Sequence, residues 1–422
     1  MRRLRSRRWR GRGVFGTDPG FVGGNELALL RGGDELFPHM LDAIHRAGSE
    51  VWLATYIFHH DTASLRLADA LVAADRRGVR VRVVVDGFGS KGSLDVLRHR
   101  LAGSGVALAV FRPIDRWWHW LQPSQLRRLH QKLCVVDGQT AFVGGINIID
   151  DRLDIHHGVT EQPRLDFAVQ LRGPLVDAVA QGLRSIWSRA WLGRDFDDAL
   201  IDYIPWRRRL RRWLTQIWRG PQRLPKATPP LPPVSAAFVM RDNLRRRRTI
   251  EHAYVDAIRG ASSRVDVVCP YFYPGQRIRL ALRQAADRGV RVRLLLQGMV
   301  DYRLAGWAAE ALYAELIAHG VEIYEYTPAF LHAKVAVVDG RWATVGSSNI
   351  DPLSLLVNLE ANVVVHDGDF TRQLDAQIET ALAVSTRVGA RGGTGLRAMV
   401  HRAAVAWVAY VFLRIAGAAG RY

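Results

Sequence analysis

The apolar and polar positions of this chain follow two different periods in turn, and the same succession occurs twice. Residues 41–58 (LDAIHRAGSEVWLATYIF) resemble residues 255–272 (VDAIRGASSRVDVVCPYF), and residues 73–89 resemble residues 284–299. In each copy a stretch with helical spacing of apolar residues ends near a glycine, and an apolar run rich in β-branched residues follows. This order predicts helix, turn and strand, which together indicate α/β architecture.

The two copies of the repeat begin about half a chain length apart. Two GVRVR strings begin at Gly78 and Gly289, a period far longer than that of a solenoid. Between the copies, an Arg- and Trp-rich stretch gives way to a proline-rich run that sustains neither helix nor sheet. We therefore expect five segments: a basic tail (1–24), a first α/β half (25–202), a linker (203–234), a second half (235–385) and a C-terminal tail with a short apolar helix (386–422).

One segment with reactive side chains occurs in both halves. It reads HQKLCVVDGQTAFVGGINI from His130 and HAKVAVVDGRWATVGSSNI from His332, with eleven of nineteen positions identical. Asp-Gly between two apolar runs predicts a β-hairpin, which places Asp137 and Asp339 at its turn. Histidine and lysine then begin one strand, two positions apart and on the same face, while glycine and asparagine end the next strand.

Lysine is rare in this chain, and half of the lysines fall in this segment. Arginine supplies 55 of the 59 basic residues, and two of the four lysines, Lys132 and Lys334, occupy equivalent motif positions. This indicates a site that needs a compact ammonium group rather than a planar guanidinium. The alternative is that both segments are core hairpins with incidental histidines, which does not explain why His, Lys and Asn recur in register.

The doubled frame H-x-K-x4-D-x6-G-[GS]-x-N resembles the paired HKD motifs of the phospholipase D superfamily. Residues 346–367 (GSSNIDPLSLLVNLEANVVVHD) resemble the bacterial cardiolipin synthases of that superfamily, in the form without two N-terminal transmembrane helices. The resemblance covers roughly Asn25 to Ser385. It implies two duplicated α/β halves, each a mixed sheet flanked by helices, packed with pseudo-two-fold symmetry around one active site.

The resemblance also implies roles for the motif residues. His130 would be the nucleophile that forms a phosphohistidine, and His332 the general acid and base; the near symmetry of the motifs leaves this order open. The other expected members of the site are catalytic Lys132, Asp137, Lys334 and Asp339 and phosphate-binding Asn147, Asn349 and Ser347. For the two aspartates the sequence favours the turn over contact with substrate. The chemistry needs no metal and no cofactor.

Each histidine of such a site needs a hydrogen-bond partner that fixes its tautomer. Asp166 and Glu360 lie downstream of the motifs in apolar, strand-like runs, where an unpaired acid is costly. The resemblance favours an orienting role for both, and leaves open which half each acid serves. The alternative is that they lie on the exposed face of an edge strand.

The two halves depart from strict equivalence in two places. Gly145 stands where the second copy has Ser347, whose hydroxyl could donate to a phosphate oxygen, so equal roles for the halves are in doubt. Residues 114–129 (IDRWWHWLQPSQLRRL) have no counterpart before the second motif. Tryptophan beside arginine suits a bilayer interface, and the alternative is a packed lid.

The net charge of +19 indicates an anionic partner, which could be nucleic acid, an anionic membrane surface or a phosphate-bearing substrate. Arginine runs at 2–12, 207–212 and 245–248 fit lipid headgroups, or are simply solvated charge. The longest apolar run, Ala403 to Leu413, falls short of the roughly 18 residues of a membrane span and suits an interfacial helix, with a marginal span as the alternative. We expect a peripheral enzyme on the cytoplasmic side of the cell membrane.

Other candidate sites are weaker. The sequences His59-His60-Asp61 and Asp154 to His157 contain metal-ligating residue types, but no HExxH or paired-cysteine spacing supports a metal site. Cys134 and Cys269 lie in separate apolar runs, which predicts buried, reduced thiols and a reducing compartment.

The resemblance implies a cardiolipin synthase-like phosphatidyltransferase, which moves a phosphatidyl group from phosphatidylglycerol to a second phosphatidylglycerol and releases glycerol. One rival is a phospholipase D-type hydrolase or a nuclease on the same scaffold, although no platform for stacking single-stranded bases is recognisable. A second rival is a non-catalytic protein that binds anionic lipid, against which the intact His, Lys and Asn of both motifs argue. Phosphatidylethanolamine as an alternative acceptor and the oligomeric state stay open.

Overall fold

The computed structural model describes residues 20–113, 127–155, 158–191, 234–241, 248–299, 312–351, 354–355 and 357–389. The expected basic tail, Trp-rich insert, linker and apolar C-terminal helix lie wholly or almost wholly outside these residues, so those predictions stay open. In the described part of the chain, no helix is both long and apolar enough to cross a membrane.

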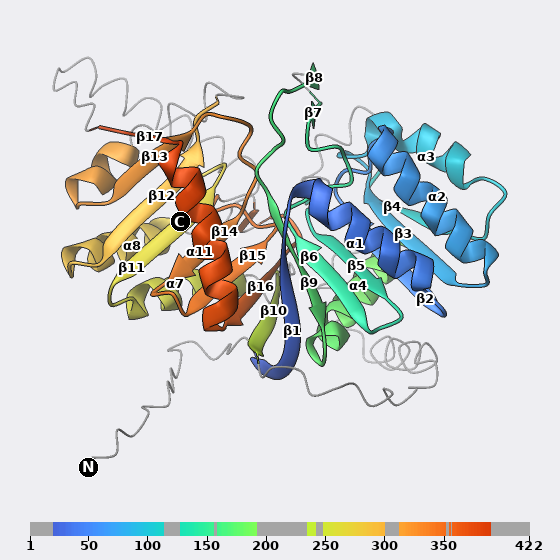
Figure 1. The fold of residues 1–422 in the computed structure, drawn as a ribbon, viewed down its shortest axis with the longest axis horizontal. Helices are drawn as coiled ribbons and strands as arrows, with labels where there is room; N and C mark the ends of the chain where they lie inside the picture. The colour runs from blue at the N-terminus through green and yellow to red at the C-terminus, as the bar shows by residue number, and fades with distance from the viewer. Residues whose placement is uncertain are drawn as a thin grey trace, which may run out of the picture.

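Strands from both copies of the repeat form one mixed sheet (Figure 1). The first half contributes β1 (Val22–Arg31), β2 (Glu50–Thr55), β3 (Arg80–Asp86), β4 (Ala107–Phe111), β5 (Lys132–Val136), β6 (Thr140–Gly144) and β9 (Phe167–Arg172). The second contributes β10 (Val234–Arg241), β11 (Arg264–Cys269), β12 (Arg291–Gln297), β13 (Glu322–Tyr326), β14 (Val335–Val338), β15 (Trp342–Gly346), β16 (Glu360–His366) and β17 (Thr386–Arg387). The order is β17-β13-β12-β11-β14-β15-β16-β10-β1-β9-β6-β5-β2-β3-β4, so the halves join where β1 pairs antiparallel with β10.

Helices cover both faces of this sheet, as the continuous apolar runs of its central strands require. The helices of the first half are α1 (Gly32–Arg46), α2 (Thr62–Arg76), α3 (Leu94–Leu101) and α4 (Leu175–Trp191), with the short 3₁₀ helix η1 (Lys91–Ser93); those of the second are α7 (Thr249–Gly260), α8 (Gln276–Asp287) and α11 (Gly368–Ala383). Along β2, Val51 and Leu53 pack in the cluster with α1, α2 and α3, whereas Trp52 and Ala54 pack in the cluster with α4. The predicted fold class, two duplicated α/β halves, is confirmed.

The strand directions place each motif at the corresponding edge of its own half, and the bridges Leu129–Leu359 and Leu165–Leu331 bring these two edges together. Strands β2, β3 and β4 are parallel to one another, and β5 runs antiparallel to β2. The start of β5, which follows His130, therefore lies at the edge where β2 ends. In the second half β14 runs antiparallel to β11, which places His332 at the corresponding edge. We call this the motif edge.

The aspartates of the two motifs lie at the opposite end of their strands. Asp137 and Asp339 turn the hairpins with positive φ of 53° and 51°. The Asp137 carboxylate accepts hydrogen bonds from the backbone N–H groups of residues 48–50, and the Asp339 carboxylate from those of residues 262–264, all at 2.8–2.9 Å. The expectation that they belong to the catalytic residues is therefore corrected: each one ties its hairpin to the turn between a helix and a strand.

We predict that Asp339→Ala lowers the free energy of unfolding by about 2–3 kcal/mol, because three backbone N–H groups and two serine hydroxyls of residues 262–264 lose their charged acceptor. The backbone hydrogen bonds hold the pKa of Asp339 well below its usual range. Its contribution is thus present above the pKa of about 4 in the unfolded chain and is lost as the pH falls. Denaturant unfolding at pH 7 and at pH 3 measures both effects. Unchanged stability would contradict the structural role.

Candidate active site

The segments that lead into the motifs cross from one half to the other. Leu129 forms a parallel bridge with Leu359, and the His130 N–H donates to the Leu359 carbonyl at 3.0 Å. The matching bridge joins Leu165 to Leu331, and the His332 N–H donates to the Leu165 carbonyl at 2.9 Å. Each histidine is therefore attached by its backbone to the strand that carries the acid of the other half.

This exchange pairs each imidazole with a buried carboxylate from the opposite half. The distance from His332 Nδ1 to Asp166 Oδ2 is 2.5 Å, and that from His130 Nδ1 to Glu360 Oε2 is 3.1 Å. Asp166 is 1% and Glu360 0% exposed, so neither lies on the open face of an edge strand. With Nδ1 bound to the carboxylate, the Nε2 atom of each ring is left for chemistry.

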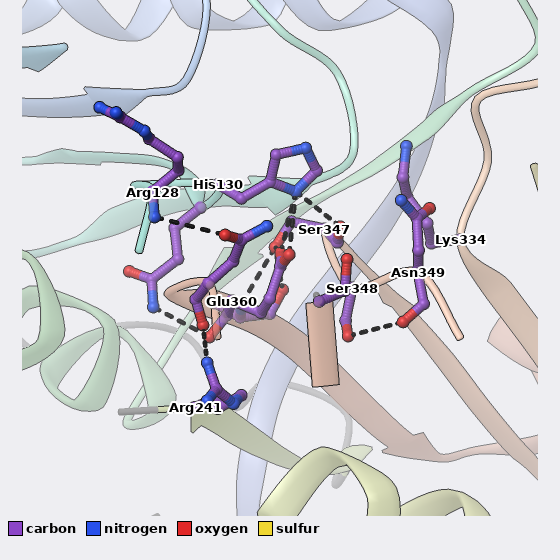
Figure 2. A network of polar contacts seen from close by, with 12 residues as sticks. Arg128, His130, Arg241, Lys334, Ser347, Ser348, Asn349 and Glu360 are labelled. Carbon is purple, nitrogen blue, oxygen red and sulfur yellow. Dashed lines mark hydrogen bonds and ion pairs between the residues drawn. The ribbon is translucent and has the colours of Figure 1, made fainter. Parts of the chain in front are cut away.

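Ser347 supports one of these pairs instead of facing substrate (Figure 2). Its hydroxyl donates to Glu360 Oε2 and accepts from the Ala361 N–H at 3.1 Å, and the residue is 0% exposed. The expectation that Ser347 binds phosphate is therefore wrong. At the equivalent Gly145, a Cβ atom would lie 2.3 Å from Asp166 Oδ1, so the first half has no room for a side chain here.

The two motif lysines follow the same pattern in both halves. Lys132 Nζ donates to the His130 carbonyl at 2.6 Å, and Lys334 Nζ donates to the His332 carbonyl. Both are almost completely buried. Each ammonium folds back beside its own histidine, which a longer, planar guanidinium could not do without displacing its neighbours.

Burial shifts the pKa values of the charged groups in the site. Burial lowers the pKa of His130, and that of His332 well below its usual value, with the nearby lysines adding to the effect. Burial also lowers the pKa of Lys132 to about 7 and that of Lys334 to about 8, and raises that of Asp166 to about 7. Burial therefore disfavours the charged form of each of these groups, and an anionic ligand would stabilise both ammonium groups.

Both motif asparagines lie at the end of the second strand of their hairpins, as expected. Asn147 is 5% and Asn349 7% exposed. Asn147 Oδ1 accepts a hydrogen bond from the Ile57 N–H at 3.2 Å, which leaves its NH₂ group to donate. In Figure 2 the side chains of Asn349 and Lys334 point the same way.

Several supporting residues were missed by the sequence reasoning. Asp86 Oδ2 accepts from the Leu129 N–H at 2.8 Å, and Gln297 Oε1 accepts from the Leu331 N–H at 3.0 Å, so each holds the residue just before a motif histidine. They end equivalent strands of the repeat, in the strings VVVD and LLLQ. The sequence signal that could have identified these two residues is their shared position, where a polar residue ends an apolar strand.

Two further side chains contribute to only one side of the site. The Tyr56 ring lies 5.0 Å from the His130 ring, and Lys132 Nζ lies 5.4 Å from the Tyr56 ring centroid, a cation–π distance. The charge of Arg164 is among the causes that lower the pKa of His332. Comparison of the two repeats could have indicated Tyr56, because Pro270 stands at the same place in the second copy.

The weaker candidate metal ligands do not assemble into a shared site in the described residues. His59 Nδ1 lies 3.2 Å from Asp61 Oδ2, and Asp61 also caps α2 by accepting from the Ser64 N–H. Asp154 forms an ion pair with Arg164 at 3.6 Å. The histidines at 156 and 157 lie outside the described residues. The thiols of Cys134 and Cys269 are buried and free, as expected.

Two imidazoles with free Nε2 atoms, two ammonium groups and two amides meet at the junction of duplicated halves. These groups define a phosphodiester-transfer enzyme of the phospholipase D type. One imidazole can serve as the nucleophile and the other as the proton donor, and the ammonium groups can stabilise the phosphoryl oxygens.

Comparison with known proteins gives the family. The chain belongs to the family described as "Cardiolipin synthase, PLD-like domain", whose model matches residues 40–159 and 254–382. It is 35% identical over 360 residues to cardiolipin synthase B of Shigella flexneri, covering 85% of this chain and 81% of the relative. Cardiolipin synthase A of Pseudomonas fluorescens is 31% identical over 370 residues, covering 86% and 70%. The crystal structure of phosphatidylserine synthase from Haemophilus influenzae shares the fold, with a TM-score of 0.63, 13% identity and 94% coverage of both chains. The predicted family and enzyme class are confirmed.

We predict that binding of a phosphodiester monoanion weakens as the pH rises, because Lys132 and Lys334 lose their protons near pH 7 and 8. Calorimetry with dimethyl phosphate, whose charge does not change in this range, should give a dissociation constant about tenfold higher at pH 9 than at pH 6.5. Lys132→Met should bind more weakly at pH 6.5 and show a flatter pH dependence. Affinity that does not fall with pH would contradict the charge assignment.

Proposed function

We propose that this chain transfers a phosphatidyl group from one phosphatidylglycerol to a hydroxyl of a second, forming cardiolipin and releasing glycerol. The observation that carries the proposal is the pair of imidazoles, each fixed by a carboxylate of the opposite half, beside two buried lysines. In such a site one imidazole can form and later break a bond to phosphorus, while the other transfers the protons, so no further nucleophile or base is needed.

In the first step, Nε2 of neutral His130 attacks phosphorus of the donor lipid. The N–P bond forms while the bond from phosphorus to the headgroup glycerol oxygen breaks. Binding of the anionic phosphodiester raises the pKa of His332 from the low value that burial and the nearby cations give it. Protonated Nε2 of His332 then gives its proton to that oxygen, so glycerol leaves as a neutral alcohol. Glu360 and Asp166 hold the Nδ1 protons and stabilise positive charge on each ring.

In the second step, the acceptor hydroxyl gives its proton to His332 Nε2 and its oxygen attacks phosphorus. The N–P bond breaks, His130 returns to its neutral form, and cardiolipin is released. Lys132, Lys334 and the NH₂ of Asn147 stabilise the phosphoryl oxygens in both steps. Water that reached the intermediate would give phosphatidic acid, so transfer requires that water be excluded.

We also propose that the motif edge faces an anionic membrane surface on the cytoplasmic side of the cell. A small hairpin of β7 (Leu153–Asp154) and β8 (Gly158–Val159) projects beyond the sheet between the two halves (Figure 1). Ile155 and Val159 on this hairpin are 51% and 83% exposed. Arg164 anchors the hairpin, since its guanidinium donates to the Leu153 carbonyl at 3.0 Å. Apolar side chains beside cationic ones suit a lipid interface.

We predict that the pure protein, incubated with phosphatidylglycerol vesicles, produces cardiolipin and glycerol. His130→Ala and His332→Ala should each reduce turnover by at least about 10⁴-fold, because each removes one partner of a coupled pair. Thin-layer chromatography and mass spectrometry of the lipids measure the products. Phosphatidic acid alone would indicate a hydrolase, and faster cleavage of DNA than of lipid would favour the nuclease alternative. Retained activity in either variant would contradict the two-histidine mechanism.

We predict that the double variant Ile155→Ser/Val159→Ser loses at least about tenfold in turnover on vesicles, because burial of each apolar side chain contributes up to roughly 1.5–3 kcal/mol to membrane binding. Turnover of the same lipid in detergent micelles should stay within about twofold, since the hairpin has no part in the chemistry. Val22→Ser is the matched control: Val22 is also exposed but starts β1 at the opposite edge of the sheet. Equal losses on vesicles and micelles would contradict membrane docking through this hairpin.

A further inference from the structure

The ring of Tyr56 lies beside both the histidine and the lysine of the first motif. The centroids of the Tyr56 and His130 rings are 5.0 Å apart, and the rings are tilted by 56° to each other. Lys132 Nζ lies 5.4 Å from the centroid of the same tyrosine ring. An aromatic ring interacts with another ring at centroid distances of about 4.5–7 Å, and with a cation at up to about 6 Å. One side chain is therefore within range of two reactive groups.

The loop that follows β3 fixes the position of this tyrosine. The Ser90 hydroxyl donates to the Tyr56 carbonyl at 3.0 Å, and its oxygen accepts the Phe58 N–H at 3.0 Å. At Gly89, a Cβ atom would lie 2.5 Å from the Tyr56 carbonyl oxygen and 2.9 Å from two carbons of its ring. Only glycine therefore allows the loop to approach so closely. The loop packs directly against Tyr56 and limits the movement of its ring.

The second copy of the repeat has different residues at both of these places. Pro270 aligns with Tyr56, and Val300 aligns with Gly89. The residue that carries the ring and the residue that makes room for it therefore change together between the copies. Proline has no aromatic face, so the histidine and lysine of the second motif receive no such interaction from this position. The tyrosine distinguishes the half that contains His130.

The proposed mechanism places positive charge beside this ring. Nδ1 of His130 keeps its proton next to Glu360, so the imidazole becomes cationic when Nε2 bonds to phosphorus. The Lys132 ammonium is buried, and burial lowers its pKa to about 7. An aromatic face attracts a cation, and more strongly where water is excluded. The ring therefore opposes the effect of burial on Lys132 and stabilises the charge that develops on His130 during attack.

We propose that Tyr56 is a positioning residue of the first half, which orients the His130 imidazole for attack and keeps the Lys132 ammonium charged. The part that concerns attack rests on the proposed transferase function, whereas the part that concerns Lys132 requires only that the site bind phosphate. Besides His130, the charged groups that act most strongly on Lys132 are Glu360, Lys334, Asp166 and Asp86. A substitution at Tyr56 leaves all of them in place.

Binding of dimethyl phosphate to the full-length protein, measured by calorimetry, tests the interaction with Lys132. Tyr56→Leu should raise the dissociation constant about threefold at pH 8 and less than twofold at pH 6, because loss of the ring lowers the pKa of Lys132 and fewer ammonium groups stay charged at the higher pH. Tyr56→Phe, which keeps the aromatic face, should recover most of the affinity. The effect of Tyr56→Leu should disappear in a Lys132→Met background and persist in a Lys334→Met background.

Turnover of phosphatidylglycerol vesicles at pH 6, where binding changes least, tests the effect on His130. Tyr56→Leu should lower kcat about tenfold and change KM by less than about twofold, because the charge on the imidazole develops only during attack. Tyr56→Met, a second variant without an aromatic ring, should lose as much. Tyr56→Phe should restore kcat to within about threefold of the wild-type value.

The outcomes separate this inference from the proposed function. Absence of cardiolipin from the wild-type reaction would overturn the transferase, and with it the role of Tyr56 in attack. Cardiolipin formation that Tyr56→Leu leaves unchanged, or that Tyr56→Phe lowers as much as Tyr56→Leu does, would leave the transferase standing and overturn the role of the ring. A loss of phosphate affinity that is equal at pH 6 and pH 8, or that remains in the Lys132→Met background, would overturn the interaction with Lys132.

Discussion

The hydrogen bond between each imidazole and a carboxylate of the opposite half is the interaction on which the site depends. His332 Nδ1 lies 2.5 Å from Asp166, and His130 Nδ1 lies 3.1 Å from Glu360, with both acids buried. An unpaired buried carboxylate would be expensive, and so would a buried imidazolium. The buried acid and the histidine of each half are therefore stabilised only when they pair with their partners in the opposite half. The bridges of Leu129 and Leu165 to the opposite half keep the pairs in register, and the shared sheet makes the duplication one structural unit.

Around this symmetrical frame, the two sides of the site differ in ways that suit unequal roles. Ser347 supports Glu360, whereas Asp166 fills the space over Gly145 and accepts the Phe167 N–H. The Tyr56 ring lies beside the ring of His130, and the charge of Arg164 acts on His332. A nucleophile and a general acid need different environments, because one must be neutral when the other is protonated. Substitutions between the repeats, such as Gly145 against Ser347 and Tyr56 against Pro270, give the two histidines different surroundings.

Much of this could be predicted from the sequence, because the repeat fixes both the α/β order and the register of His, Lys and Asn. Asp166 and Glu360 could be predicted as orienting acids, since an acid inside an apolar strand needs a partner. Their exchange between halves could not, because it depends on strand pairing far apart in the chain. The role of Ser347 was predicted wrongly: spacing shows that a hydroxyl is present but not which neighbour it meets. Asp86 and Gln297 were harder to predict because one is an acid and the other an amide, although they accept hydrogen bonds from equivalent backbone N–H groups, those of Leu129 and Leu331.

The central claim is that His130 attacks phosphorus and the acceptor alcohol then displaces it, with His332 as proton donor and acceptor, so that the phosphatidyl group is transferred by two successive displacements. The stereochemical course at phosphorus tests this most directly. Phosphatidylglycerol with a phosphorothioate centre of known configuration is converted to product, and the configuration of the product is determined by ³¹P NMR. Each in-line displacement inverts the centre, so the account predicts overall retention. Inversion would mean that the acceptor attacks the donor lipid directly, and would contradict the phosphohistidine mechanism.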